Sequence, residues 1–235
     1  MGVVSRETTG GGAPAPPPVA VEYFADRLSL IERYADLLAG PGIERGLLGP
    51  REVPRLWERH LLNCAVVHEV VPPDSDVVDV GSGAGLPGVV LAIIRPDLAV
   101  TLVEPLLRRH AFLSEVIAAL ELTNVALIRS RAEDLPDKVL ADVVTARAVA
   151  PLDRLARWSL PLLRAGGLLV AIKGSSVDAE LAASAGFLEA QGAVSWHVGR
   201  YGAGVVEPVT LAAVVDVGDR SALRGRESRS RRRRR

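Results

Sequence analysis

A glycine-rich run at residues 79–88 is the part of the chain best suited to bind a ligand. It reads Asp-Val-Gly-Ser-Gly-Ala-Gly-Leu-Pro-Gly and begins inside the apolar segment 77–80. Glycines permit a tight turn and let a ligand approach the backbone closely. Glu104 ends the next apolar segment, about 20 residues after the first glycine, where nucleoside-binding folds bind the ribose hydroxyls. This combination predicts a nucleoside cofactor.

Asp79 narrows the class of cofactor. Its carboxylate comes two residues before Gly81, where it would repel the pyrophosphate that dinucleotides place on a helix N-terminus. It would suit a ligand with a cationic amino group. S-adenosylmethionine carries an ammonium group, a sulfonium group and no phosphate. The Asp-x-Gly-x-Gly-x-Gly run resembles the cofactor loop of class I S-adenosylmethionine-dependent methyltransferases.

The elements that position these residues alternate along the chain. Five short apolar segments predict strands at 77–80, 99–103, 125–128, 141–145 and 168–172. Helical patterns follow near 89–94, 106–121, 152–163 and 177–191. Two last strands, 193–198 and 209–217, have no helix between them and predict an antiparallel hairpin. The alternation predicts an α/β fold with a doubly wound, mostly parallel, seven-stranded, Rossmann-like sheet and helices on both faces.

Composition divides the chain into four regions. The Gly/Pro-rich residues 1–18 predict a disordered lead, and residues 19–73 predict a helical N-terminal extension. Its first helix begins at residue 19 and is ended by the run Gly40-Pro41-Gly42, and its second spans about 53–70. The methyltransferase domain is expected over 74–218. Residues 219–235 predict a disordered tail, in which residues 221–235 contain eight arginines and one glutamate. Such a basic tail on an acidic body favours a polyanionic partner.

Composition also excludes several classes of protein. The chain of 235 residues is 49% hydrophobic and 24% charged, but no apolar run approaches the ~18 residues that span a bilayer. The N-terminus lacks the basic and then apolar pattern of a secretory signal. Cys64 is the single cysteine, which allows neither an internal disulfide nor a cysteine-rich metal site. We therefore expect a cytoplasmic protein without metal or membrane association.

Several further motifs occur in the order and spacing of one family. They are Leu86-Pro87-Gly88, Arg131-Ala132-Glu133, Arg147-Ala148, Lys173-Gly174 and the helix that contains His60. In these motifs the chain resembles the bacterial 16S rRNA guanine-N7 methyltransferases, also called the glucose-inhibited division protein B family, over about residues 25–215. The resemblance implies S-adenosyl-L-methionine as cofactor and methylation of N7 of a guanine in a loop of 16S rRNA. Its partner would be 16S rRNA or the small ribosomal subunit.

The resemblance also implies roles for single residues. Cofactor-binding residues would be Gly81, Gly83 and Leu86 at the methionine end, Glu104 at the ribose, Ala132 and Glu133 at the adenine, and Arg147 beside the cofactor. RNA-binding residues would be Arg108, Arg109, Arg131 and Lys173. No catalytic residue is assigned, and the candidates for positioning the target base are Arg131, Arg147 and Lys173. Where the family commonly has Asp-Ser after the His60 turn, this chain has Asn63-Cys64, and near the last strand it has Glu207-Pro208 where many relatives are basic.

Most of these residues also have a purely structural interpretation. Ser130 and Glu133 fit a capping box, and Glu104 could cap the next helix. The other structural alternatives are a solvated helix face for Arg108 and Arg109, an ion pair for Arg147, a strand exit for Lys173, and core packing for His60 and Cys64.

Guanine N7 carries a lone pair and no proton, so its methylation by in-line displacement needs no general base. Three other functions remain open. They are a small-molecule S-adenosylmethionine-dependent methyltransferase, a nicotinamide-dependent oxidoreductase and a non-catalytic RNA-binding protein. A parallel-sheet core of this size is often monomeric, and we expect a monomer.

Overall fold

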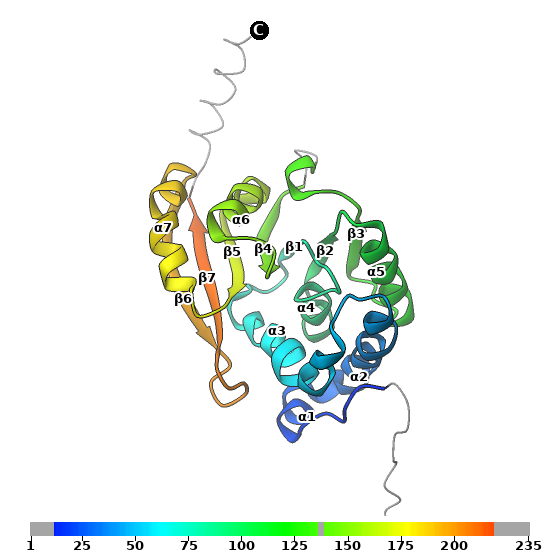
Figure 1. Cartoon of the computed structure of the whole chain (residues 1–235). Helices are drawn as coiled ribbons and strands as arrows, with labels where there is room; N and C mark the ends of the chain where they lie inside the picture. Colours follow the sequence, from blue (N-terminus) through cyan, green and yellow to red (C-terminus); the bar gives the residue numbers. More distant parts are fainter. Residues whose placement is uncertain (1–11, 136–138, 219–235) are drawn as a thin grey trace, which may run out of the picture.

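A seven-stranded sheet runs through the centre of the molecule (Figure 1). The structure is a computed structural model that describes residues 12–135 and 139–218. Its strands are β1 (Asp76–Val80), β2 (Ala99–Val103), β3 (Val125–Ile128), β4 (Ala141–Arg147), β5 (Leu163–Lys173), β6 (Ala193–Tyr201) and β7 (Thr210–Val217). They lie in the order β3-β2-β1-β4-β5-β7-β6. The predicted strands are all present.

The pairing of the strands locates the ligand-binding edge. Strands β3, β2, β1, β4 and β5 are parallel, and β7 is antiparallel to both β5 and β6. The predicted hairpin is therefore confirmed. The chain moves outward from β1 to β2 and β3 and then returns to β4 on the other side of β1. Ligands of doubly wound sheets bind at such a reversal, outside the carboxyl ends of the strands.

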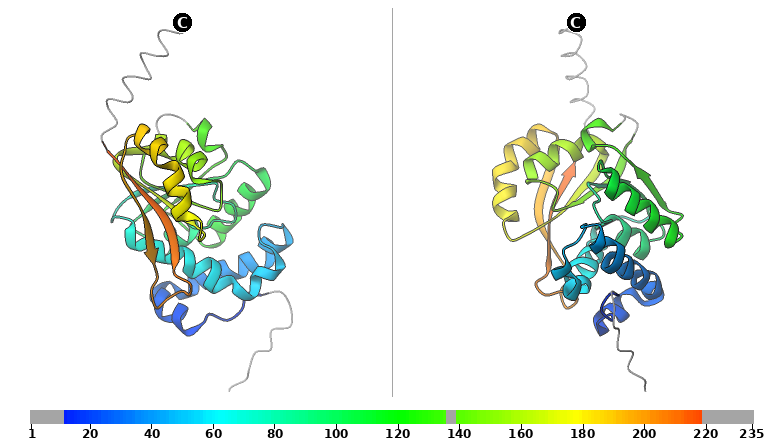
Figure 2. Two further views of the ribbon diagram at one scale, coloured as in Figure 1. Left: turned by 60° about the vertical axis from the view of Figure 1, so that its left-hand side comes forward. Right: turned by 45° about the vertical axis from the view of Figure 1, so that its right-hand side comes forward.

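Helices cover both faces of the sheet (Figure 2). On one face lie α4 (Gly88–Ile94) and α5 (Leu107–Ala119), whose side chains share a core cluster with Val77 of β1. On the other face lie α6 (Leu152–Ser159) and α7 (Val177–Ala190), which share a second cluster with Val78. Successive residues of a strand point to opposite faces, so a strand buried on both sides must be apolar throughout, as β1 largely is.

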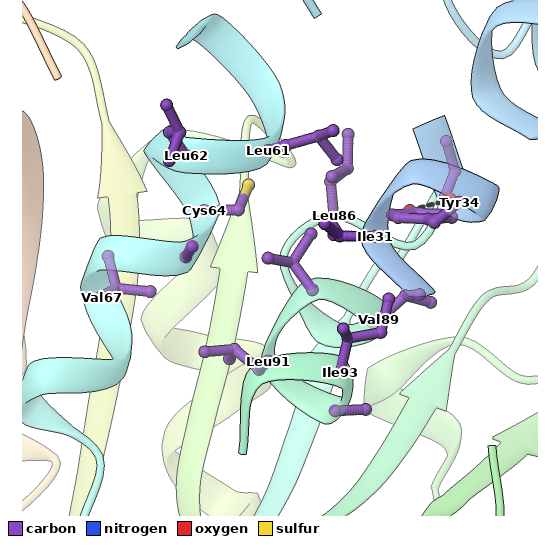
Figure 3. Close-up of a cluster of buried hydrophobic side chains, with 14 of the residues drawn as sticks. Ile31, Tyr34, Leu61, Leu62, Cys64, Val67, Leu86, Val89, Leu91 and Ile93 are labelled. Carbon is purple, nitrogen blue, oxygen red and sulfur yellow. Dashed lines mark hydrogen bonds between the residues drawn. The ribbon is translucent and has the colours of Figure 1, made fainter. Parts of the chain in front are cut away.

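The N-terminal extension packs on the α4 face. It comprises α1 (Pro18–Phe24), η1 (Ala25–Arg27), α2 (Leu28–Leu37), η2 (Leu38–Gly42), η3 (Pro50–Arg55), η4 (Leu56–Leu62), α3 (Asn63–Ala65) and η5 (Val66–Val70). Figure 3 shows side chains of α2, η4 and α4, among them Ile31, Leu61 and Val89, in one buried cluster. The extension therefore belongs to the same core as the sheet domain.

Two predictions about the extension differ from the structure. The run Gly40-Pro41-Gly42 is predicted to end the first helix, but η2 passes through it as a wider helical turn and helical backbone continues to residue 44. Residues 12–18 were expected to be disordered, yet the amide of Ala13 donates to Asp36 and the indole of Trp57 donates to the carbonyl of Pro14. The remainder of the predicted lead, residues 1–11, and the tail, residues 219–235, lie outside the described residues.

None of the helices in the described part of the chain is long and apolar enough to cross a membrane.

Candidate active site

A cavity of about 820 Å³ opens where β1, β2 and β4 end. Four segments contribute to its walls: the glycine-rich loop after β1, residues 103–106 from the end of β2, residues 130–133 after β3 and residues 147–149 from the end of β4. These four segments are far apart in sequence, and the parallel strands bring them to one edge. The predicted cofactor-binding residues Gly81, Gly83, Leu86, Glu104, Ala132, Glu133 and Arg147 all line it. The structure thus brings the whole predicted set together.

The glycine-rich loop has a backbone that few other residues could adopt. Gly81, Gly83 and Gly85 have φ angles of +70°, +59° and +102°, a left-handed region that strains residues with a Cβ atom. The Ser82 hydroxyl donates to the carbonyl of Asp79 and accepts from the amide of Val103, at 2.9 and 3.1 Å. These bonds fasten the turn to β2. The loop is therefore preorganised around the cavity.

Asp79 does not face the cavity, although its spacing from Gly81 predicts that its carboxylate meets the cofactor. Its side chain is fully buried, and Oδ2 accepts a 3.0 Å hydrogen bond from the amide of Gly88 at the start of α4. Oδ1 has no hydrogen-bond partner among the described residues, and Asp79 is not among the residues that line the cavity. Burial raises the pKa of this carboxyl group to about 7. Asp79 supports the loop from behind rather than facing the ligand.

Glu104 joins the loop to the next helix. Its carboxylate is buried, with Oε2 accepting from the amide of Gly83 and Oε1 from the amide of Leu106, both at 2.9 Å. The amide of Leu106 belongs to the residue before α5, and α5 has no side-chain cap, so the structural interpretation of Glu104 as a helix cap is wrong. The same carboxylate lines the cavity, where a pair of ribose hydroxyls would find an acceptor already held in place.

The segment after β3 forms a further wall. Ala132 is buried, whereas Arg131 and Glu133 are exposed at the cavity. The predicted capping box is wrong, because the Ser130 hydroxyl donates to the carbonyl of Arg131 and the short helix η6 (Ala132–Asp134) has no side-chain cap. The Glu133 side chain therefore does not cap η6.

Arg147, the last residue of β4, is held by the N-terminal extension. Nη1 donates to Sγ of Cys64 at 3.2 Å, and Nη2 donates to the carbonyl of Arg59 at 3.1 Å and to Nδ1 of His60 at 2.9 Å. The expected alternative, an ion pair, is not what holds this side chain. His60 is buried, as its core interpretation predicts, but it also lines the cavity. Cys64 is buried as expected.

A second cavity, of about 780 Å³, adjoins the first. The two share Arg147, Ala148 and Val149, and the second is also lined by Arg59, Asn63 and Lys173. Asn63 donates from Nδ2 to the hydroxyl of Thr210 at 2.7 Å, so η4 and α3 reach across to β7. Residues 147–149 form the boundary between the two cavities.

The predicted RNA-binding residues differ in how free their side chains are to contact RNA. Lys173 is largely engaged, because Nζ donates to the carbonyl of Ala150 at 2.6 Å and to Glu180 at 2.8 Å. Arg109 lines the first cavity and Arg131 is exposed there, whereas Arg108 is exposed outside the described cavities. A groove beside the second cavity carries Arg55, Arg59 and Arg200 together with Lys173. These three arginines are basic residues that sequence reasoning missed.

Other wall residues of the first cavity were also missed. They are Leu47 and Leu48 between η2 and η3, Val149 after β4, and Arg154 and Trp158 on α6. None belongs to the glycine-rich or basic motifs. A helical period on α6 would have placed Arg154 and Trp158 on one face, four residues apart, but nothing local shows that this face meets the cavity.

Comparisons with known proteins agree with this arrangement. The family model described as rRNA small subunit methyltransferase G matches residues 27–204. The curated ribosomal RNA small subunit methyltransferase G of Thermobifida fusca is 56% identical over 202 residues, which cover 86% of this chain and 85% of that protein. The protein of that name from Streptomyces avermitilis is 52% identical and covers 97% of this chain and 100% of its own length.

Solved structures share the fold at low identity. An S-adenosylmethionine-dependent O-methyltransferase from Thermotoga maritima has a TM-score of 0.55 and 13% identity, covering 72% of this chain and 71% of that one. A ribosomal protein L11 methylase from Lactobacillus delbrueckii subsp. bulgaricus has a TM-score of 0.52 and 16% identity, covering 68% and 78%. The predicted fold class is confirmed.

Proposed function

The chain belongs to the rRNA small subunit methyltransferase G family, and from this premise we propose that it methylates N7 of a guanine in the 16S rRNA of the small ribosomal subunit. The observation that carries the proposal is the pair of cavities that meet at Arg147. A methyl donor in the first cavity and a base in the second would face each other across residues 147–149. We propose that the protein acts as a monomer in the cytoplasm, where ribosomes assemble.

The first cavity suits S-adenosylmethionine. Glu104 offers a fixed carboxylate for two ribose hydroxyls, and a Cβ atom at Gly83 would meet no protein atom closer than 3.8 Å, so the backbone there is open to a ligand. Burying the apolar parts of the ligand would fall to Leu86, Ala132 and Leu106. The carboxyl group of Asp79 is buried behind the loop, and a cation in front of it would favour the ionised form of this group. S-adenosylmethionine would supply an electrophilic methyl group there.

The second cavity suits a purine presented by its major-groove edge. Guanine offers the O6 acceptor beside N7 on this edge, and arginine is the side chain that commonly donates to O6. Arg147 stands at the boundary and Arg59 lines the second cavity. Such a base must leave its stack, as in a loop or an extruded nucleotide. Alignment of N7 with the methyl group would be the main source of acceleration, because no proton has to be removed.

The test is transfer of labelled methyl from S-adenosylmethionine to small ribosomal subunits of a strain that lacks the modification. The proposal expects label in the 16S rRNA. Isothermal titration is run in parallel with S-adenosylmethionine and with NAD, and binding of the first alone is expected. Binding of NAD alone would favour an oxidoreductase. Donor binding with methylation of small molecules but not of subunits would favour the small-molecule enzyme, and donor binding without any transfer would refute catalysis on RNA.

A further inference from the structure

Three side chains from three elements form a chain of contacts that ends between the two cavities. Glu52 on η3 lies with Oε2 2.8 Å from Nε2 of His60 on η4. The other ring nitrogen of His60, Nδ1, lies 2.9 Å from Nη2 of Arg147 at the end of β4. Glu52 lines neither of the two cavities, whereas Arg147 lines both.

The chemistry of arginine fixes the protons along this chain. A guanidinium group can only donate hydrogen bonds, so Nδ1 of His60 must accept and carries no proton. The proton of a neutral imidazole then sits on Nε2 and is donated to the Glu52 carboxylate. Burial and the nearby charge of Arg147 lower the pKa of His60, which agrees with a neutral ring. Around His60, the charged groups are Glu52 on η3, Arg59 on its own element and Arg147 on β4.

The contacts of Arg147 leave part of its guanidinium free for a substrate. The bonds to Cys64, Arg59 and His60 use three of its five N–H groups. The other two, on Nε and Nη1, have no protein partner among residues 12–135 and 139–218. Their direction is set by the three bonds already made. The acceptor at Nδ1 of His60 therefore helps to aim the free donors.

We propose that Glu52 is a positioning residue for methyl transfer, acting through His60 to hold the guanidinium of Arg147 at the boundary where the base meets the methyl donor. The inference rests on the proposed function, since it assigns a role within that site. Glu52 fixes the tautomer and ring orientation of His60, and His60 presents the lone pair that Arg147 needs. Arg59 also approaches Glu52, with Nε 3.5 Å from Oε2, but such an exposed contact contributes little.

The first test compares Glu52→Ala with Glu52→Gln, whose amide oxygen can still accept from Nε2. The assay is single-turnover methyl transfer to small subunits with donor and subunits both saturating. Glu52→Ala is expected to slow the step about tenfold, the equivalent of one lost hydrogen bond of ordinary strength. The Kd for S-adenosylmethionine should stay within about twofold, because Glu104 and the glycine-rich loop are untouched. Glu52→Gln should recover most of the rate.

The control is Glu44→Ala. Glu44 is an exposed acid of the same N-terminal extension that lines none of the described cavities. The substitution Glu44→Ala removes the same charge as Glu52→Ala and is expected to leave the rate of methyl transfer unchanged. A purely structural role for Glu52 would instead lower the melting temperature and the donor affinity together with the rate.

A second pair of variants keeps the inference testable if Glu52→Ala folds poorly. The amide oxygen of His60→Asn can take the place of Nδ1 and accept from Arg147, whereas His60→Leu has a similar volume and no acceptor. The inference expects His60→Asn to be at least about fivefold faster than His60→Leu.

Equal rates of the two His60 variants, or a Glu52→Ala rate equal to the wild-type rate, would overturn the inference. Methyl transfer by the wild-type protein would still support the proposed function in that case. Absence of transfer by the wild-type protein would refute both.

Discussion

Substitution of Gly81 by alanine separates backbone strain from loss of the cofactor site. Gly81 has φ +70°, and a Cβ atom there would lie 3.0 Å from Cγ2 of Val149. Gly204, in the connection from β6 to β7, has φ +79° and nothing within 4 Å of the same atom. The left-handed backbone costs an alanine about 1–2 kcal/mol at either position. Both variants should therefore lose at least this much free energy of unfolding, and Gly81→Ala loses more because its methyl group meets Val149.

Only Gly81→Ala should weaken cofactor binding. The added methyl group must displace Val149, and both residues line the first cavity. A contact of 3.0 Å is too close for two carbons, and relief by a small shift would reshape the gap between the β1 loop and the end of β4. We expect the Kd for S-adenosylmethionine to rise at least tenfold, or about 1.4 kcal/mol.

Calorimetric titration at a temperature where both variants are folded measures this difference, and urea unfolding measures the shared strain. Gly204→Ala should bind the donor as the wild type does. The reasoning is refuted if Gly81→Ala binds with wild-type affinity, or if both variants lose affinity equally.

Three further predictions concern stability and the basic tail. The pKa of Asp79 is raised to about 7 from 3.8, so the folded state binds its proton more tightly than the unfolded chain. The stability that this group contributes is therefore lost as the pH rises from 3.8 to about 7. Asp79→Asn should flatten this fall of the unfolding free energy, which urea titrations across the same pH range would measure. Tyr34→Phe removes the 2.8 Å bond from its buried hydroxyl to the carbonyl of Ala84 and should lower the unfolding free energy by about 1–3 kcal/mol; an unchanged urea midpoint would contradict this. Deletion of residues 221–235 should raise the apparent KM for RNA at moderate salt and leave donor affinity unchanged, because phosphate attraction is screened by salt; equal KM values across a salt titration would discard a role for the tail.

Local chemistry explains why most of the fold and half of the site could be predicted from sequence. The strands are short apolar runs between helical patterns, and the lack of a helix between 198 and 209 was enough to predict the hairpin. The glycine-rich loop and Glu104 were recognisable because turn conformation and strand position depend on neighbouring residues. Where the prediction was wrong for residues 12–18, hydrogen bonds to Asp36 of α2 and Trp57 of η4 override a local signal for disorder.

The remaining features of the site depend on contacts between distant segments. The partners of Arg147 come from η4 and α3, more than 80 residues earlier in the chain. Lys173 looked available, but Glu180 and the carbonyl of Ala150 occupy it. Asp79 was expected to face the ligand because its distance from Gly81 is short, yet β-strand alternation turns its side chain toward α4. Such directions follow from the three-dimensional packing and not from spacing.

The central claim is that guanine N7 in the small subunit receives the methyl group, and chemical cleavage of the reacted RNA tests it most directly. Borohydride reduction followed by aniline breaks the chain at N7-methylguanosine. After reaction with the wild-type protein, 16S rRNA should be cut at one new position, and that cut should be absent without S-adenosylmethionine. Label incorporated without any new cut would place the methyl group on a different atom and contradict the account.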